Sequence, residues 1–136
     1  MFRVVLGNTR CSAAGVDLNR AWDQPSRKLT PTIFALKRLL AQLHESKPGG
    51  NGVALYVDLH GHSVKRDIFV YGVERRDLWA ADPERHRLRE RLFPLLLGRA
   101  HPPFSFRGSK FKVPRSKETT ARVVCARELG IAQSYT

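Results

Sequence analysis

The feature that most restricts the fold is a short apolar run at residues 53–57 (VALYV), which follows a stretch of turn-forming residues at 48–52. A run of this length bounded by Gly and Pro predicts a strand. Because the run does not alternate with polar residues, it is typical of a strand covered on both faces in a mixed or parallel sheet. We therefore expect an α/β fold with this strand inside it.

Helical periodicity precedes the strand. Thr30 and Pro31 predict a helix start at which the Thr30 side chain caps the first free amides. The apolar face of this helix then recurs at helical spacing, at Ile33, Leu36, Leu39, Leu40 and Leu43.

Further elements follow an α/β alternation. Strands are predicted over 3–6, 68–72 and 131–136, with a weaker pattern over 104–113. A helix is predicted from Asp82 to about Leu97, and another over 117–129 that Gly130 closes. The expected apolar positions of the helix that begins at Asp82 are Leu88, Leu92, Leu95 and Leu96.

The charge balance favours acidic partners. The chain has 136 residues and a formal net charge of +12, a length that supports one domain with a modest core. Nucleic acid, anionic lipid and acidic peptide all fit the charge. No apolar run approaches the roughly 18 residues of a spanning helix, so we expect no membrane partner. Two cysteines favour a reducing, cytoplasmic environment.

Two histidines follow the central strand in the segment DLHGHS at residues 58–63. Catalytic and binding groups gather at the carboxyl ends of such strands, where His60 and His62 could bind a metal or transfer protons. The competing interpretation is a loop with surface histidines. A catalytic zinc site needs three protein ligands, and none of the five histidines is followed by Glu in an HxxE pattern.

Several cations are candidates for binding an anion. Asn19 and Arg20 lie side by side, and an Arg fork with an Asn amide suits a carboxylate, whereas Arg10 could stabilise an oxyanion. Each could equally be a solvated loop residue. A basic stretch interleaved with aromatic residues could bind single-stranded nucleic acid, although we favour a solvated face backed by core side chains. Its members are Lys110, Lys112, Arg115, Lys117, Arg122, Phe104, Phe106 and Phe111.

An ordered set of segments from about residue 6 to residue 136 resembles the cytosolic carboxypeptidases, a branch of the zinc metallocarboxypeptidases. The segments include NTRCS at 8–12, GVDLNRAW at 15–22, LYVDLHGHS at 55–63, FVYG at 69–72, TARVV at 120–124 and SYT at 134–136. The resemblance implies part of the zinc-carboxypeptidase fold, which has a mixed, mostly parallel sheet flanked by helices. It also implies proteolytic removal of C-terminal glutamates, including those of polyglutamylated tubulin tails.

The resemblance assigns roles to individual residues. His60 matches a zinc ligand, Asn19 and Arg20 match the pair that holds the substrate's terminal carboxylate, and Arg10 matches the group that polarises the scissile carbonyl. Arg122 or Lys117 is expected to receive a glutamate side chain.

The expected domain is a partial peptidase domain over residues 1–136. The family's HxxE zinc pair should precede Asn8, and its general-base Glu should lie beyond Thr136, so we expect this isolated chain to lack peptidase activity. A non-catalytic module that binds acidic peptide tails is the main alternative. A nucleic-acid-binding protein is a lesser one.

Overall fold

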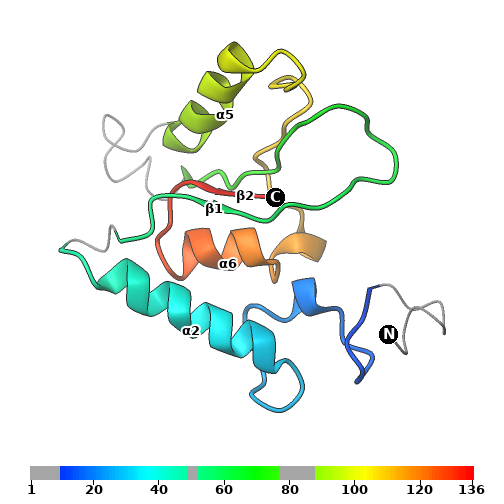
Figure 1. The fold of residues 1–136 in the computed structure, drawn as a ribbon, viewed down its shortest axis with the longest axis vertical. Coiled ribbons are helices and arrows are strands. Elements are labelled where there is room, and N and C mark those ends of the chain that lie inside the picture. Colours follow the sequence, from blue (N-terminus) through cyan, green and yellow to red (C-terminus); the bar gives the residue numbers. More distant parts are fainter. Residues whose placement is uncertain (1–9, 49–51, 77–87) are drawn as a thin grey trace.

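The computed structural model describes residues 10–48, 52–76 and 88–136 (Figure 1). The predicted strand at 3–6, most of the turn at 48–52, and the part of the second predicted helix before Leu88 lie outside the described residues. The elements are η1 (Leu18–Arg20), α2 (Pro31–Glu45), β1 (Tyr56–Val57), α5 (Arg89–Ala100), η2 (Arg115–Lys117), α6 (Ala121–Arg127) and β2 (Ser134–Tyr135).

The strands β1 and β2 pair in parallel, with Tyr56 opposite Ser134 and Val57 opposite Tyr135. Helix α6 packs against both strands, and in Figure 1 α2 lies beyond α6 while α5 lies on the other side of the strands. The predicted α/β class and the parallel pairing are confirmed. Because the two strands are parallel, the carboxyl end of β1 lies beside the carboxyl end of β2, at the end of the chain.

The predicted strands around the pair are shorter than expected. Ile68 and Tyr71 form single parallel bridges, to Phe104 and Lys110, instead of strands over 68–72 and 104–113. Tyr71 and Thr136 also exchange two backbone hydrogen bonds, of 2.7 and 3.0 Å. These bridges fix the backbone of Tyr71 next to the end of β2.

The prediction that residues 53–57 form a strand covered on both faces is wrong. Only Tyr56 and Val57 are in a strand, and the Leu55 and Val57 side chains are 42% and 38% exposed. Within the described residues, β1 has β2 on one edge and α6 on one face. The apolar run therefore keeps a solvent-facing side in this structure.

Helix α6 is the centre of the core. Residues 121–126 are all buried, and Trp22, Ile33 and Leu40 pack against its Val124 and Cys125 side chains. Beyond the end of this helix, Gly130 adopts the left-handed conformation, with a φ of +75°, which glycine takes at little cost. The Ile131 amide then donates to the Cys125 carbonyl at 3.0 Å, so Gly130 closes this helix as the sequence predicts. The predicted start at Lys117 is wrong, because Lys117 ends the separate turn η2 and α6 begins at Ala121.

The start of α2 is predicted correctly, but its cap is not. The helix begins at Pro31, yet the Thr30 side chain makes no capping bond. Instead, its hydroxyl donates to the Ser26 carbonyl and accepts from the Ser26 amide, so Thr30 holds the preceding turn. On the predicted apolar face, Ile33 and Leu40 are buried, whereas Leu36, Leu39 and Leu43 are exposed.

The predicted inner face of α5 is reversed. All four of its expected core leucines (Leu88, Leu92, Leu95 and Leu96) are exposed, while Glu90 and Pro94 are buried. Phe93 and Leu97 pack against the cluster that contains Phe111 and Tyr135. The Tyr135 hydroxyl also donates to the Glu90 carbonyl at 2.8 Å, and these tertiary contacts set the rotation of the helix.

We predict that Gly72→Ala destabilises the fold by about 1–3 kcal/mol, because overpacking a filled site forces its neighbours to move. A Cβ at Gly72 would lie 2.5 Å from the Phe111 Cδ1 atom, in the core. Urea unfolding measures the change. Gly61→Ala is the matched control, since no atom lies within 4 Å of its added Cβ. Equal unfolding free energies for the two variants would contradict the packing.

Candidate functional site

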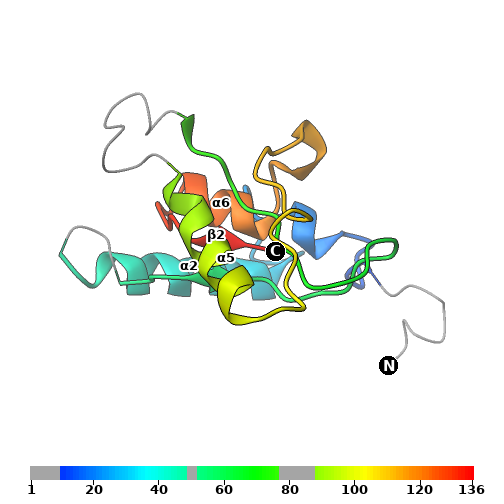
Figure 2. The same ribbon diagram turned by 90° about the horizontal axis from the view of Figure 1, so that it is seen from above.

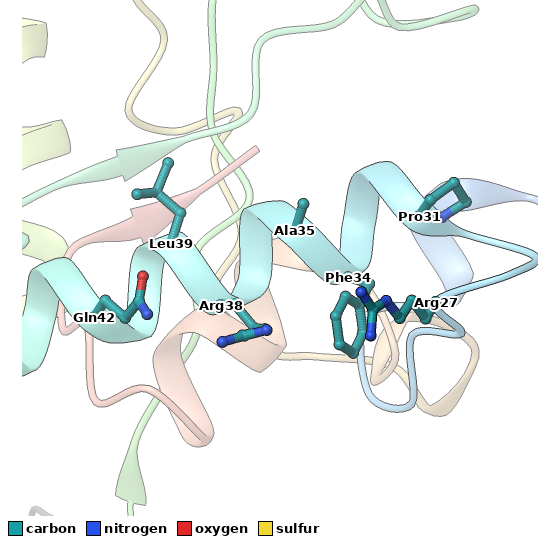
Figure 3. Close-up of a pocket in the computed structure, with 7 residues that line it drawn as sticks. All are labelled: Arg27, Pro31, Phe34, Ala35, Arg38, Leu39 and Gln42. Carbon is teal, nitrogen blue, oxygen red and sulfur yellow. The ribbon is translucent and has the colours of Figure 1, made fainter.

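Two hollows among the described residues differ in chemistry. The smaller, of about 440 Å³, runs along the outer side of α2 (Figure 3). It contains none of the site residues predicted from the sequence, and its lining is formed by Arg27, Pro31, Phe34, Ala35, Arg38, Leu39 and Gln42. The larger, of about 680 Å³, is the candidate site.

All six predicted site residues line the larger hollow, which we call the basic pocket: Arg10, Asn19, Arg20, His60, Lys117 and Arg122. They come from the first described loop and η1, from the loop after β1, from η2 and from the first turn of α6. Figure 2 shows residues 10–20 beside the loop after β1. The rest of the lining comprises Gly61, His62, Ser63, Tyr71, Lys110, Lys112, Pro114, Thr120 and Thr136.

Asn19 joins three separate parts of the pocket wall. Its Oδ1 accepts the Ala121 amide at the start of α6 at 3.0 Å, and its Nδ2 donates to Asp58 Oδ2, just after β1, at 3.1 Å. Its own amide donates to Asp17 Oδ1 at 3.1 Å, at the start of η1. One of the two Nδ2 hydrogens remains for a ligand, so Asn19 has a structural role besides its predicted one.

Asp58 continues this chain of hydrogen bonds to His60. Its Oδ1 lies 3.2 Å from His60 Nδ1. The pairing with a carboxylate places the imidazole proton on Nδ1 and leaves the Nε2 lone pair available. This is the outer contact that metal-binding histidines commonly have.

The donor set for a metal is incomplete in the described residues. No group of three His, Cys, Asp or Glu side chains that could hold an ion occurs in residues 10–48, 52–76 and 88–136. One oriented imidazole does not hold zinc in an open catalytic site. His60 is therefore suited to be one ligand, but the described residues do not by themselves fit the metal.

The pocket is strongly cationic. Arg10, Arg20, Lys110, Lys112, Lys117 and Arg122 line it, whereas none of the described lining residues is Asp or Glu. Burial lowers the pKa of Lys117, and repulsion from Arg20, Arg10 and Arg122 lowers it further, against a smaller opposite effect of Asp17. Burial also lowers the pKa of Arg122, and repulsion from Arg20 adds to this, whereas Tyr71 and Asp58 act in the opposite direction. An anionic ligand would relieve both effects.

Asp17 orients Arg10 at the edge of the pocket. Its Oδ2 accepts the Arg10 Nε–H at 2.7 Å. Burial raises the pKa of Asp17, but the hydrogen bonds from Arg10 and the Asn19 amide, with the charges of Arg10 and Arg20, more than offset this and leave it below 3.8. Arg20, in turn, donates to the Asn19 carbonyl at 2.7 Å.

The aromatic residues of the basic stretch are part of the core. Phe104 and Phe111 are buried, so their rings are not available for stacking on bases. Lys110 and Lys112 are exposed and reach the pocket.

Sequence reasoning missed Asp58 and Tyr71 as site residues. Asp58 precedes His60 by two positions, and a carboxylate at that spacing from a candidate metal ligand could have indicated it.

A solved structure shares the fold of this chain. The structure matches a metallo-carboxypeptidase from Burkholderia cenocepacia with a TM-score of 0.71 and 22% identity, over 96% of this chain and 30% of that one. At this identity the match establishes the fold, which is part of the metallo-carboxypeptidase fold.

Sequence comparison finds relatives along almost the whole chain. The chain is 41% identical over 140 residues to cytosolic carboxypeptidase 1 of Danio rerio, and 42% identical over 134 residues to cytosolic carboxypeptidase 2 of Mus musculus. It is 39% identical to cytosolic carboxypeptidase 4 of Homo sapiens. Over the segment that they share, the chain is therefore similar to the cytosolic carboxypeptidases at about 40% identity. That segment is 98% of this chain and 12–14% of these relatives, and no family model matches the chain.

We predict that Asn19→Ala destabilises the protein by about 1–3 kcal/mol, because the Ala121 amide and one Asp58 oxygen each lose a partly buried partner. Amide hydrogen exchange at Ala121 should accelerate, which NMR can follow. Gln42→Ala, on the exposed side of α2, is the control and should change little. Unaltered exchange at Ala121 would show that the bridge is absent.

We predict that Lys117→Gln is more stable than the wild type at neutral pH, and that the difference shrinks as the pH rises towards 10.5. The pKa of Lys117 is lowered by folding, so the unfolded chain binds more protons in the window just below 10.5, and wild-type stability rises with pH there. Unfolding curves at a series of pH values measure this. Lys28→Gln removes an exposed lysine outside the pocket lining and should not show the trend.

Proposed function

We propose that the basic pocket binds the C-terminal end of an acidic peptide, and that it is the substrate-binding part of a carboxypeptidase that removes C-terminal glutamates. The observation that carries this proposal is the convergence of six cations, Asn19 and His60 on one hollow in a chain that is similar to the cytosolic carboxypeptidases. Acidic protein tails such as polyglutamylated tubulin are the partners we propose.

The pocket offers groups for each part of such a ligand. The Arg20 guanidinium and the remaining Asn19 amide hydrogen suit the terminal carboxylate, which accepts several hydrogen bonds at once. Arg10, oriented by Asp17, suits the carbonyl of the bond to be cleaved. Arg122 or Lys117 suits a glutamate side chain, since both lose unfavourable repulsion when an anion binds.

Zinc is the metal we propose for the complete enzyme, with His60 as one of its ligands. Bound zinc would polarise a carbonyl and activate a water molecule. The sequence of 136 residues contains no HxxE pair. We therefore propose that this polypeptide alone binds acidic C-termini without hydrolysing them, which also describes the alternative of a non-catalytic binding module.

The cytosol is the compartment we propose, because the relatives are cytosolic carboxypeptidases by name. Among the described residues, no helix is long and apolar enough to cross a membrane.

We predict that a peptide ending in three glutamates binds the chain, and that amidating its C-terminus weakens binding at least tenfold, because Arg20 then loses its charged partner. Arg20→Ala should weaken binding of the free-acid peptide by about the same factor and make it insensitive to amidation. Fluorescence anisotropy at fixed salt measures both.

Arg99→Ala is the matched control, because it removes one exposed arginine of α5 outside the pocket lining. Equal affinity for the acid and amide peptides would refute recognition of the terminal carboxylate. Tighter binding of a single-stranded oligonucleotide than of the peptide would instead favour a nucleic-acid ligand.

A further inference from the structure

The two histidines of the segment at 58–63 have different surroundings. His60 Nδ1 contacts the Asp58 carboxylate, whereas His62 Nδ1 accepts two backbone amides, from Val64 at 3.2 Å and from Lys65 at 3.0 Å. A nitrogen that accepts hydrogen bonds carries a lone pair. His62 therefore has its proton on Nε2 when the ring is neutral.

This tautomer fixes the direction of the next hydrogen bond. His62 Nε2 lies 3.2 Å from the Tyr71 hydroxyl oxygen. Because Nε2 carries the proton, His62 donates and Tyr71 accepts. The hydroxyl proton of Tyr71 then points away from His62, and no group in the described part of the chain accepts it.

Tyr71 is held firmly in the pocket wall. Its backbone is fixed by two hydrogen bonds with Thr136 and by the bridge to Lys110. Its ring packs edge-on against Phe69, with centroids 5.5 Å apart, and the Arg122 guanidinium carbon lies 5.6 Å from the centroid of the Tyr71 ring. Tyr71 thus lies between His62 and Arg122, and all three line the basic pocket.

We propose that the Tyr71 hydroxyl, oriented by His62, donates a hydrogen bond to a carboxylate of the peptide that Arg122 also contacts. The proposal rests on the proposed function and adds to it a specificity-determining residue, Tyr71, and a positioning residue, His62. A phenol that donates to a carboxylate beside an arginine makes a charge-assisted hydrogen bond. This pair selects an acidic side chain over an apolar one of similar size.

Tyr71→Phe tests the hydroxyl alone, because the ring that packs on Phe69 and faces Arg122 remains. We expect it to weaken binding of the glutamate-ended peptide about tenfold and to leave unfolding stability nearly unchanged. Binding of a peptide with the same backbone but leucine as its last residue should not change. Tyr56→Phe removes a hydroxyl outside the pocket lining and is the control. Equal losses for both peptides, or none, would overturn the role of the hydroxyl.

Two variants of His62 test the positioning role. His62→Asn keeps an acceptor near the Val64 and Lys65 amides but is too short to reach Tyr71, whereas His62→Gln is long enough to donate to it. We expect His62→Asn to weaken glutamate-peptide binding about threefold, and His62→Gln to restore part of the loss. In the Tyr71→Phe background, His62→Asn should have no further effect. Additive losses would show that His62 does not act through Tyr71.

Two measurements keep this inference separate from the proposed function. NMR of the His62 ring nitrogens should show the Nε2–H tautomer in the wild type and in Tyr71→Phe, and an Nδ1–H tautomer would overturn the inference without any ligand. If the wild type does not bind the glutamate peptide, the proposed function fails. Inorganic phosphate is then the probe, and the inference fails unless Tyr71→Phe weakens phosphate binding.

Discussion

The pocket depends on the hydrogen bonds of one short side chain, Asn19. Its amide contacts the first turn of α6 and the carboxylate that follows β1, which lie 102 and 39 residues away in sequence. Through Asp58 the same network reaches His60. Partly buried amide hydrogen bonds weaken steeply with distance and angle, so this network restricts how far the three wall segments can move apart. The position of the candidate metal ligand is thereby coupled to the start of the central helix.

The central helix in turn explains why cations can be concentrated in one place. Residues 121–126 of helix α6 are buried, and among them Arg122 lines the pocket with 5% of its surface exposed. A buried cation needs a partner, and within the described residues Arg122 has a π face and a carbonyl at 3.5 Å, without a paired carboxylate. The apolar packing of α6 offsets this cost. The pocket is therefore assembled at some expense of stability, as is common for sites that bind charged ligands.

Local sequence patterns predicted the helix ends that depend on the backbone of a single residue. The start of α2 at Pro31 follows from the fixed φ of proline, and the end of α6 follows from the left-handed backbone of Gly130. The rotation of α5 could not be predicted in this way, because the contacts of Phe93 and Leu97 with distant residues decide it.

Most of the candidate site was found through the family resemblance, since neither charge nor spacing indicated that Arg10 and Arg122 share a pocket. Tyr71 was missed because its significance depends on a hydrogen bond to His62 that only the folded loop creates.

The two aspartates near the pocket show how its charge is kept. Asp17 and Asp58 are outside the pocket lining, but they make hydrogen bonds with the lining residues Arg10, Asn19 and His60. In that position they orient the pocket side chains and offset part of the repulsion between the cations. Placed inside the lining, the same carboxylates would compete with an acidic ligand for the arginines. Asp17 and Asp58 therefore orient the pocket side chains, while the surface that contacts the ligand stays positive. A positive surface is the electrostatic requirement for selecting an acidic chain end.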